Sequence, residues 1–231
     1  MNAAIDLAQL RSWIGRTETA EETLSATLVE RFLATLSLGD TKPIPDEFAP
    51  RLIHFCLCQP AVPMEALGED GHPALGGFLP PVPLPRRMWA SSKIAFHGDL
   101  RIGDTVQRTS HIADLQIKEG RTGTLCFVTV NHTFSVENEL KIEDRQTIVY
   151  RSLQTTPPPA TVNAAPQGDV VIPVDPTPAL LFRYSALTFN SHRIHYDAPY
   201  ATEIENYPGL VVHGPLQATL LLRLATHIQS R

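Results

Sequence analysis

Cysteine is scarce in this sequence, which has three among 231 residues. Cys56, Cys58 and Cys126 are too few and too unevenly placed for a disulfide framework, so we expect reduced thiols in a cytoplasmic protein. The single residue between Cys56 and Cys58 is not the usual zinc spacing, which favours two partly buried thiols. The number and spacing of the cysteines therefore predict neither a disulfide scaffold nor a metal site.

Positive charge and long apolar runs are scarce as well. Lys and Arg total 19 against 24 Asp and Glu, and the formal net charge is -5, so a nucleic-acid partner has no electrostatic basis. No segment approaches the roughly 18 apolar residues that a membrane span needs. The start, MNAAIDLAQLRSW, lacks the apolar core of a secretory signal. We expect no membrane partner.

Hydrophobic periodicity predicts two helices near the N-terminus, followed by a long loop. In residues 7–15 (LAQLRSWIG) and 28–38 (LVERFLATLSL), apolar side chains recur at helical spacing. Between Pro60 and Pro85 the chain is dense in proline and glycine, which removes backbone donors and fixes φ too often for a helix or a central strand. We expect an ordered loop there.

Beyond this loop the period changes to two, which is typical of strands. Residues 87–99, 104–121, 123–138 and 139–151 are rich in Val, Ile, Thr and Phe and are separated by turn-forming residues. In the third segment one face carries Cys126, Val128, Val130 and Phe134. The pattern predicts an antiparallel meander with one buried side.

A proline-rich stretch separates this meander from the last part of the chain. Residues 155–178 cannot bury enough surface to offset chain entropy, so they predict a linker. After it we expect a strand at 179–189 and a short helical turn at 192–199. A strong helix at 214–229 begins with Pro215 at its first turn and carries an apolar stripe of Leu216, Leu220, Leu221, Leu224 and Ile228.

The segment TFNSHRIHYDAPYA, Thr188 to Ala201, is polar and rich in histidine although a clearly apolar helix follows it. Such a composition is poorly suited to a core and well suited to a site. His192, His195, His213 and His227 also raise the question of a metal. No Cys, Asp or Glu joins them at ligand-like spacing, so we expect none.

The segment TFNSHRIH resembles the S-G-D-x-N-P-x-H hallmark of the MaoC-like, R-specific hydratases and dehydratases of acyl thioesters. Together with GGFLPPVPLPRRMWA and FHGDLRIGD, it is most similar to the branch that contains mesaconyl-CoA hydratases and hydroxyacyl-thioester dehydratases type 2. The resemblance extends from Trp13 to the C-terminus. It implies an α+β fold, the double hot dog, in which antiparallel sheet wraps a helix.

This resemblance also implies a division of the chain. Residues 1–151 would form a degenerate, non-catalytic hot-dog domain, 152–176 the linker, and 177–231 a catalytic hot-dog domain. Only one expected strand precedes the last helix, so the second hot dog is expected to be incomplete at the C-terminal end. Arg86 and Arg87 in the first domain could meet the phosphates of coenzyme A or could simply be solvated.

Aligned with the hallmark, Asn190 and His195 are the expected catalytic residues. His195 would take a proton from water, since an imidazole exchanges protons near neutral pH. Asn190 stands where relatives carry Asp, and an amide can orient water but has no proton to transfer. Either His195 returns the proton itself, or activity is reduced or lost. The alternative for both residues is hydrogen bonding within a turn.

Gly214 and His213 are the expected substrate-binding residues. The backbone N–H of Gly214, at the positive end of the last helix, would bind the thioester oxygen, and the missing side chain would let a ligand approach. The alternative is a glycine that only the turn requires. His213 would contact substrate or cap the helix.

The implied activity is hydration or dehydration of an acyl-CoA or, less favoured, an acyl-carrier-protein thioester, with a short branched or dicarboxylic acyl group such as mesaconyl. No cofactor is expected, which agrees with the absence of Rossmann and P-loop glycine motifs. Two alternatives remain open, a thioesterase and a catalytically silent thioester-binding protein. The resemblance also leaves room for a homodimer.

Overall fold

The computed structural model describes residues 5–36, 47–120, 123–152, 166 and 168–229. Within them, five antiparallel strands form one sheet in the order β1-β3-β4-β5-β2. The strands are β1 Thr17–Thr23, β2 Arg86–Phe96, β3 Thr105–Gly120, β4 Gly123–Val136 and β5 Glu139–Arg151. The helices are α1 Leu7–Arg11, α2 Ala26–Leu36, α3 Pro178–Leu187 and α4 Gly214–Gln229, with short 3-10 turns at Ile53–Cys56, Met64–Ala66 and Arg193–His195 and a π turn at Tyr200–Ile204.

The predicted meander is correct for β3, β4 and β5. The hairpin between β4 and β5 turns at Glu137 and Asn138, whose φ values of 49° and 67° match a two-residue turn with left-handed backbone. Strand β2 instead pairs with β5, on the side of the sheet away from β3. The edge strand β1 was not predicted, because its sequence TETAEET is mostly exposed and lacks an apolar face.

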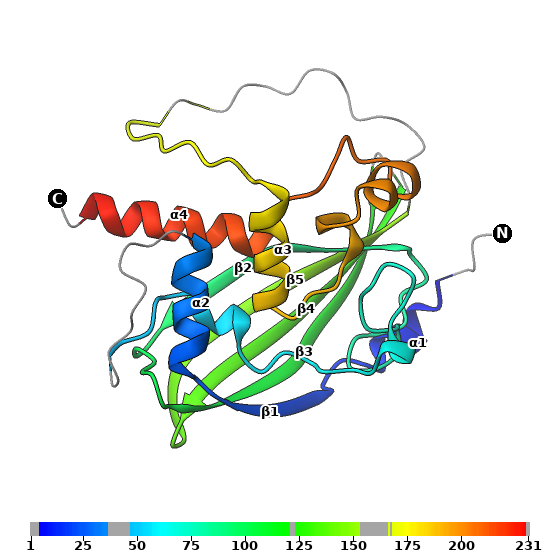
Figure 1. Cartoon of the computed structure of the whole chain (residues 1–231). Coiled ribbons are helices and arrows are strands. Elements are labelled where there is room, and N and C mark those ends of the chain that lie inside the picture. Colours follow the sequence, from blue (N-terminus) through cyan, green and yellow to red (C-terminus); the bar gives the residue numbers. More distant parts are fainter. Residues whose placement is uncertain (1–4, 37–46, 121–122, 153–165, 167, 230–231) are drawn as a thin grey trace.

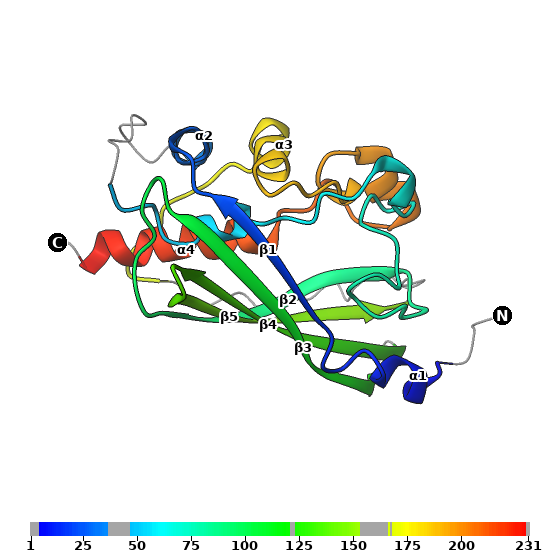
Figure 2. The same cartoon turned by 90° about the horizontal axis from the view of Figure 1, so that it is seen from below.

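Helices α2, α3 and α4 lie on the same side of the curved sheet (Figures 1 and 2). The main core forms between them and the sheet, and it joins segments far apart in the sequence. Its fully buried members include Phe32 of α2, Val106 of β3, Leu181 and Tyr184 of α3, and Leu216 of α4. The sheet therefore provides the surface on which the C-terminal helices are packed.

The strand predicted at 179–189 is wrong, because these residues form α3. Thr177 caps the helix by accepting a hydrogen bond from the Leu180 N–H at 3.2 Å, and Pro178 occupies the first turn. The buried residues Leu181, Tyr184 and Ser185 follow a helical spacing rather than alternation.

The other expectations for helices and loops are largely confirmed. Helices α1 and α2 lie within or next to the segments predicted for them, although residues 37–38 lie outside the described part of the chain. The segment from Pro60 to Pro85 contains one 3-10 turn and no strand or α-helix. Most of the predicted linker, 153–165 and 167, also lies outside the described residues. The division into two domains and the partial second hot dog stay predictions.

Helix α4 is confirmed, but its apolar stripe is buried over the first turns alone. Leu216 is fully buried, whereas Leu221 is 65% and Ile228 45% exposed. Figure 1 shows the second half of α4 extending past the sheet. In the described residues, no helix combines the length and apolar character that crossing a bilayer requires.

The three cysteines are free and buried, more completely than expected. Burial raises the pKa of Cys56 to about 12 and that of Cys126 to about 11. These thiols therefore stay protonated and unreactive near neutral pH.

Candidate active site

The polar segment after α3 is shaped by hydrogen bonds to that helix. The Thr188 hydroxyl donates to the Tyr184 carbonyl at 2.9 Å, and the Asn190 N–H donates to the Ser185 carbonyl at 2.9 Å. Between them, Phe189 has a left-handed φ of 46° and an exposed ring. The chain thus turns sharply at the end of α3 and enters the 3-10 turn Arg193–His195, where the His195 ring is buried.

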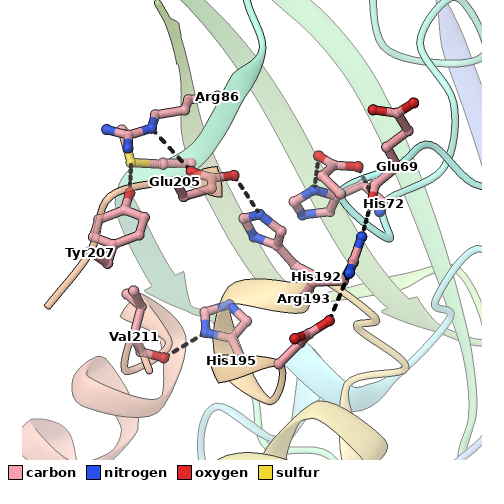
Figure 3. A network of polar contacts seen from close by, with 12 residues as sticks. Glu69, His72, Arg86, His192, Arg193, His195, Glu205, Tyr207 and Val211 are labelled. Atoms are coloured by element: carbon pink, nitrogen blue, oxygen red, sulfur yellow. Dashed lines mark hydrogen bonds and ion pairs between the residues drawn. The ribbon is translucent and has the colours of Figure 1, made fainter. Parts of the chain in front are cut away.

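His195 is fixed in one tautomer. Its Nδ1 lies 2.7 Å from the Val211 carbonyl, and because a carbonyl can only accept, Nδ1 carries the hydrogen (Figure 3). The Nε2 atom therefore keeps a free lone pair. Burial lowers the pKa of His195 to about 4, against the opposing effect of the Val211 hydrogen bond. The ring is a neutral imidazole near pH 7, able to accept a proton at Nε2.

His213 lies against His195, so the structure brings two of the expected site residues together. The two rings stack with centroids 3.6 Å apart at an interplanar angle of 18°. His213 Nε2 lies 2.8 Å from the Ser185 hydroxyl of α3, and the residue directly precedes α4. Burial, and then the neighbouring His195, lowers the pKa of His213 to about 3. The pair therefore lies at the N-terminus of α4 in uncharged form.

Gly214, the third expected residue, is the first residue of α4. A Cβ at this position would lie 2.4 Å from Cε3 of Trp89 in β2, so only glycine fits. The space left by the missing side chain is filled by an indole ring, which differs from the ligand approach that we expected. Its N–H still belongs to the first turn of α4, where N–H groups lack intrahelical acceptors. A role in substrate binding stays a prediction.

Asn190, the fourth expected residue, has a turn role in the structure. Its Oδ1 accepts a hydrogen bond from the His192 N–H at 3.0 Å, which fixes the backbone that leads to His195. This contact corresponds to the alternative given for Asn190 from the sequence. A catalytic role for its amide stays a prediction.

His192 connects His195 to a buried ion pair. Its ring meets His195 edge to face, with centroids 5.4 Å apart, and its Nε2 lies 3.8 Å from Oε1 of Glu205. The other oxygen of Glu205 lies 3.0 Å from Nε of Arg86 (Figure 3). Arg86 is only 4% exposed, so it is not a solvated residue of the strand start. No motif or spacing in the sequence indicated this role for Glu205.

The loop 68–72 packs directly onto the histidine segment. The Asp70 carbonyl accepts from the Arg193 N–H at 2.9 Å, and the Ser191 hydroxyl donates to the Gly71 carbonyl. Gly71 has a φ of +86°, and a Cβ there would lie 1.9 Å from the Ser191 carbonyl oxygen. No side chain fits between the two segments. The loop therefore fixes the backbone from which His192 and His195 project.

The same loop contributes an acid and an imidazole that the sequence did not single out. Asp70 Oδ2 accepts from His72 Nδ1 at 2.8 Å, and the His72 ring lies against His192 with centroids 4.0 Å apart. Although burial raises the pKa of Asp70, its hydrogen bonds from His72 lower it well below the usual range. Burial lowers the pKa of His72 to about 3. A row of contacting rings thus runs through His72, His192, His195 and His213.

Asp70, His72 and His192 also offer three potential metal-ligand atoms within 4.8 Å of one another. Carboxylate and imidazole groups are common zinc ligands. Here, however, Asp70 and His72 are hydrogen-bonded to each other, and His192 faces Glu205. These contacts account for the cluster without an ion. His227, considered earlier with the other histidines, is exposed in the last turn of α4.

A pocket of about 350 Å³ lies beside this network. Asp70 and Glu205 are both part of its wall, so the pocket borders the two carboxylates that contact His72 and His192. The rest of the wall is largely apolar and includes Leu75, Leu84 and Ile204. A pocket of this size can accept a short acyl group.

Two curated relatives are similar to this chain over most of its length. The mesaconyl-C(4)-CoA hydratase of Chloroflexus aurantiacus is 47% identical over 226 residues, which cover 97% of this chain and 81% of that protein. The mitochondrial hydroxyacyl-thioester dehydratase type 2 of Schizosaccharomyces pombe is 32% identical over 194 residues, 73% of this chain and 64% of the yeast protein.

Solved structures confirm the hot-dog fold class. HtdX of Mycobacterium tuberculosis matches with a TM-score of 0.60 at 24% identity, covering 90% of this chain and 75% of that one. A Mycobacterium tuberculosis protein described as having a double hotdog fold matches with a TM-score of 0.54 at 14% identity, covering 94% and 74%. At these identities the likeness concerns the fold alone.

The family resemblance is confirmed by a direct match. The family model "Hydroxyacyl-thioester dehydratase type 2" matches residues 52–231, which include the histidine segment, the loop 68–72 and helix α4. The names of the family and of both curated relatives denote hydratases or dehydratases, which are hydro-lyases. The chain therefore belongs to the hydroxyacyl-thioester dehydratase type 2 family.

Proposed function

We propose that this protein adds water to the C2=C3 bond of an enoyl-CoA and catalyses the reverse dehydration of the 3-hydroxyacyl-CoA. We further propose a short branched or dicarboxylic acyl group such as mesaconyl. The observation that carries the proposal is His195, a buried neutral imidazole with Nδ1 bound to Val211 and Nε2 free as a base. The name of the Chloroflexus relative, mesaconyl-C(4)-CoA hydratase, supports the substrate class.

In the proposed reaction, Nε2 of His195 takes a proton from water while the water oxygen bonds to C3. The π electrons of the C2=C3 bond shift to C2 and the thioester oxygen, giving an enolate. The imidazolium then gives its proton to C2, and the thioester carbonyl reforms. A pKa of about 4 makes His195 a weak base but its imidazolium a strong acid, which suits the second step. Asn190 need not transfer a proton in this scheme.

The enolate oxygen would be stabilised at the N-terminus of α4. The first N–H groups of a helix lack intrahelical acceptors and carry partial positive charge. Gly214 belongs to this turn, and His213 directly precedes it. Losing one such donor typically raises the barrier by about 2.7 to 4 kcal/mol. The helix end is thus expected to contribute as much to the rate as the base does.

A catalytically silent thioester-binding protein is the second candidate. Asn190 replaces the Asp of the hallmark, and its Oδ1 is engaged by the His192 N–H rather than by a site group. If the second carboxylate of relatives is indispensable, this protein would bind acyl-CoA without converting it.

A panel of enoyl- and 3-hydroxyacyl-CoAs tests these alternatives. Loss of enoyl absorbance reports hydration, free thiol reports thioester hydrolysis, and calorimetry reports binding alone. We expect the parent to hydrate at least one substrate and His195→Ala to lose about 10²- to 10⁴-fold in rate. His227→Ala, an exposed histidine of α4, is the control and should retain the parent rate. Equal rates for parent and His195→Ala would refute the proposed base.

A further inference from the structure

The pocket beside the histidine network contains a cation that no carboxylate neutralises directly. Arg86 pairs with Glu205 at 3.0 Å, and Arg193 pairs with Asp197 at 2.8 Å. Arg87 lines the pocket, is half-buried, and has no carboxylate oxygen within 4.0 Å among the described residues. Arg86, the preceding residue in the chain, differs from Arg87 because it forms an ion pair with Glu205.

The guanidinium of Arg87 donates from Nη2 to the Pro73 carbonyl, at 3.2 Å, and it also interacts with the Tyr150 hydroxyl. These contacts orient the guanidinium, while the charge of Asp70 acts on it from beyond ion-pair distance. A partly desolvated guanidinium is stabilised best by an oxyanion that accepts two parallel N–H bonds.

Tyr150 adds a hydroxyl to the same pocket. The residue is fully buried and lines the pocket, and its hydroxyl proton has no acceptor among the described residues. Burial raises the pKa of Tyr150 to about 12, and the charge of Arg87 and its hydrogen bond to the hydroxyl oxygen act in the opposite direction. A buried hydroxyl proton without an acceptor is costly, so Arg87 and Tyr150 offer adjacent donors to an entering oxyanion.

Two of the three acidic side chains of the pocket wall are engaged by other residues. Glu205 contacts Arg86 and His192, and Asp70 accepts hydrogen bonds from the backbone and ring of His72. Glu69 is exposed. The remaining wall is mainly apolar, which suits an acyl chain.

We propose that Arg87, assisted by the Tyr150 hydroxyl, binds the free carboxylate of a dicarboxylic acyl-CoA and so selects it over an uncharged acyl group of the same length. This proposal rests on the proposed function, because it assigns the pocket to the acyl group of the thioester. The pocket adjoins the histidine network through Asp70 and Glu205, which contact His72 and His192, and His192 in turn contacts His195.

A binding measurement tests the proposal without depending on catalysis. Succinyl-CoA and butyryl-CoA have saturated acyl groups of equal carbon number, and one alone carries a free carboxylate. We expect Arg87→Met to weaken succinyl-CoA binding about 10- to 100-fold, as for loss of a charged hydrogen bond, and to change butyryl-CoA binding less than about threefold. Arg145→Met, an exposed arginine of β5, should leave both dissociation constants unchanged.

Comparing succinyl-CoA with butyryl-CoA also distinguishes binding of the acyl carboxylate from binding of the coenzyme A phosphates, because both ligands contain the phosphates. Equal weakening of both ligands in Arg87→Met would place Arg87 on a phosphate and overturn the proposal, as would unchanged binding of succinyl-CoA. Arg87→Lys keeps the charge without the two parallel donors and should recover part of the affinity, while thermal melting of each variant verifies folding. Hydration of mesaconyl-CoA against crotonyl-CoA then tests the proposed function separately. If the protein hydrates neither substrate but Arg87→Met still weakens succinyl-CoA binding selectively, the proposed catalysis is refuted and the carboxylate site is supported.

Discussion

His54 and His195 are both buried imidazoles, but their surroundings differ. His54 is 1% exposed and lies against Phe55 and Phe134, with ring centroids at 4.6 and 5.0 Å. Neither of its nitrogens has a hydrogen-bond partner in the described structure, and Asp144 lies 3.9 Å away. His195 instead donates from Nδ1 to Val211 and borders two further imidazoles.

The comparison shows that a lowered pKa does not identify a catalytic base. Burial lowers the pKa of His54 to about 3 and that of His195 to about 4, so both rings are neutral near pH 7. The difference lies in the partner of one nitrogen and the location of the ring. The fixed tautomer of His195, next to the N-terminus of α4, orients a lone pair that can accept a proton. The His54 ring has no hydrogen bond that would orient either nitrogen.

The largest expected effect is a difference in hydration rate between variants of His195 and of His54. His195→Ala should lower the hydration rate about 10²- to 10⁴-fold, since it removes the proton acceptor. His54→Leu should change the rate less than about threefold and leave stability unchanged or raised, because it removes two unpaired nitrogens from the core. Steady-state kinetics and urea unfolding measure both. A similar loss of rate in His54→Leu would contradict the comparison.

The backbone that presents His195 can be disturbed at Gly71. In Gly71→Ala a Cβ would overlap the Ser191 carbonyl, and we expect overpacking to cost about 1 to 3 kcal/mol in unfolding free energy. Gly15→Ala is the control, because Gly15 has a similar φ of +91° and open space around it. Both variants share the backbone strain of roughly 1 to 2 kcal/mol. Equal destabilisation would show that the contact with Ser191 is not required.

Acid should destabilise the protein through its neutral buried histidines. Burial lowers the pKa of His54, His72, His132, His195 and His213 below the usual 6.5, so between about pH 4 and 6.5 the unfolded chain binds more protons than the folded one. Their contribution to stability is present above pH 6.5 and is lost as the pH falls.

Asp144 acts in the opposite direction. Burial raises its pKa from 3.8 to about 6, so the stability it contributes is present below pH 3.8 and is lost as the pH rises through about 6. The five histidines should outweigh it, and the melting temperature should fall from pH 7 to pH 5. His54→Leu should flatten this slope. A melting temperature independent of pH would contradict the predicted protonation states.

The smallest effect concerns the partner of His213. Ser185→Ala removes the hydroxyl 2.8 Å from His213 Nε2, which should cost about 1 kcal/mol of stability. The ring should still stack on His195, so we expect the rate to fall only a few fold. Denaturant unfolding and kinetics at saturating substrate measure the two effects. A loss as large as that of His195→Ala would give the hydroxyl a direct role in the reaction.

The sequence predicted correctly those structural elements that depend on residues close together in the chain. The alternating strands, the Gly-Pro start of α4 and the histidine turn all depend on near neighbours in the chain. The strand predicted at 179–189 failed because the spacing of Leu181, Tyr184 and Ser185 was not weighed against the β-forming composition. The edge strand β1 escaped notice because an exposed strand needs no apolar face.

The remaining parts of the candidate site depend on distant pairs. Arg86 meets Glu205, and Gly71 meets Ser191, across more than a hundred residues of chain. No periodicity or turn signal connects such positions. The burial of Arg86 and the roles of Asp70 and His72 could therefore be recognised only once the loop 68–72 was seen against the histidine segment.

The close approach of Gly71 to Ser191 bears on how this family can evolve. Any side chain at position 71 would displace the backbone at 191, two residues after the left-handed Phe189 and four before His195. Natural variation at these two sites should be correlated, and exchange of either segment alone between distant homologues should abolish function in the chimera even when every catalytic side chain is retained.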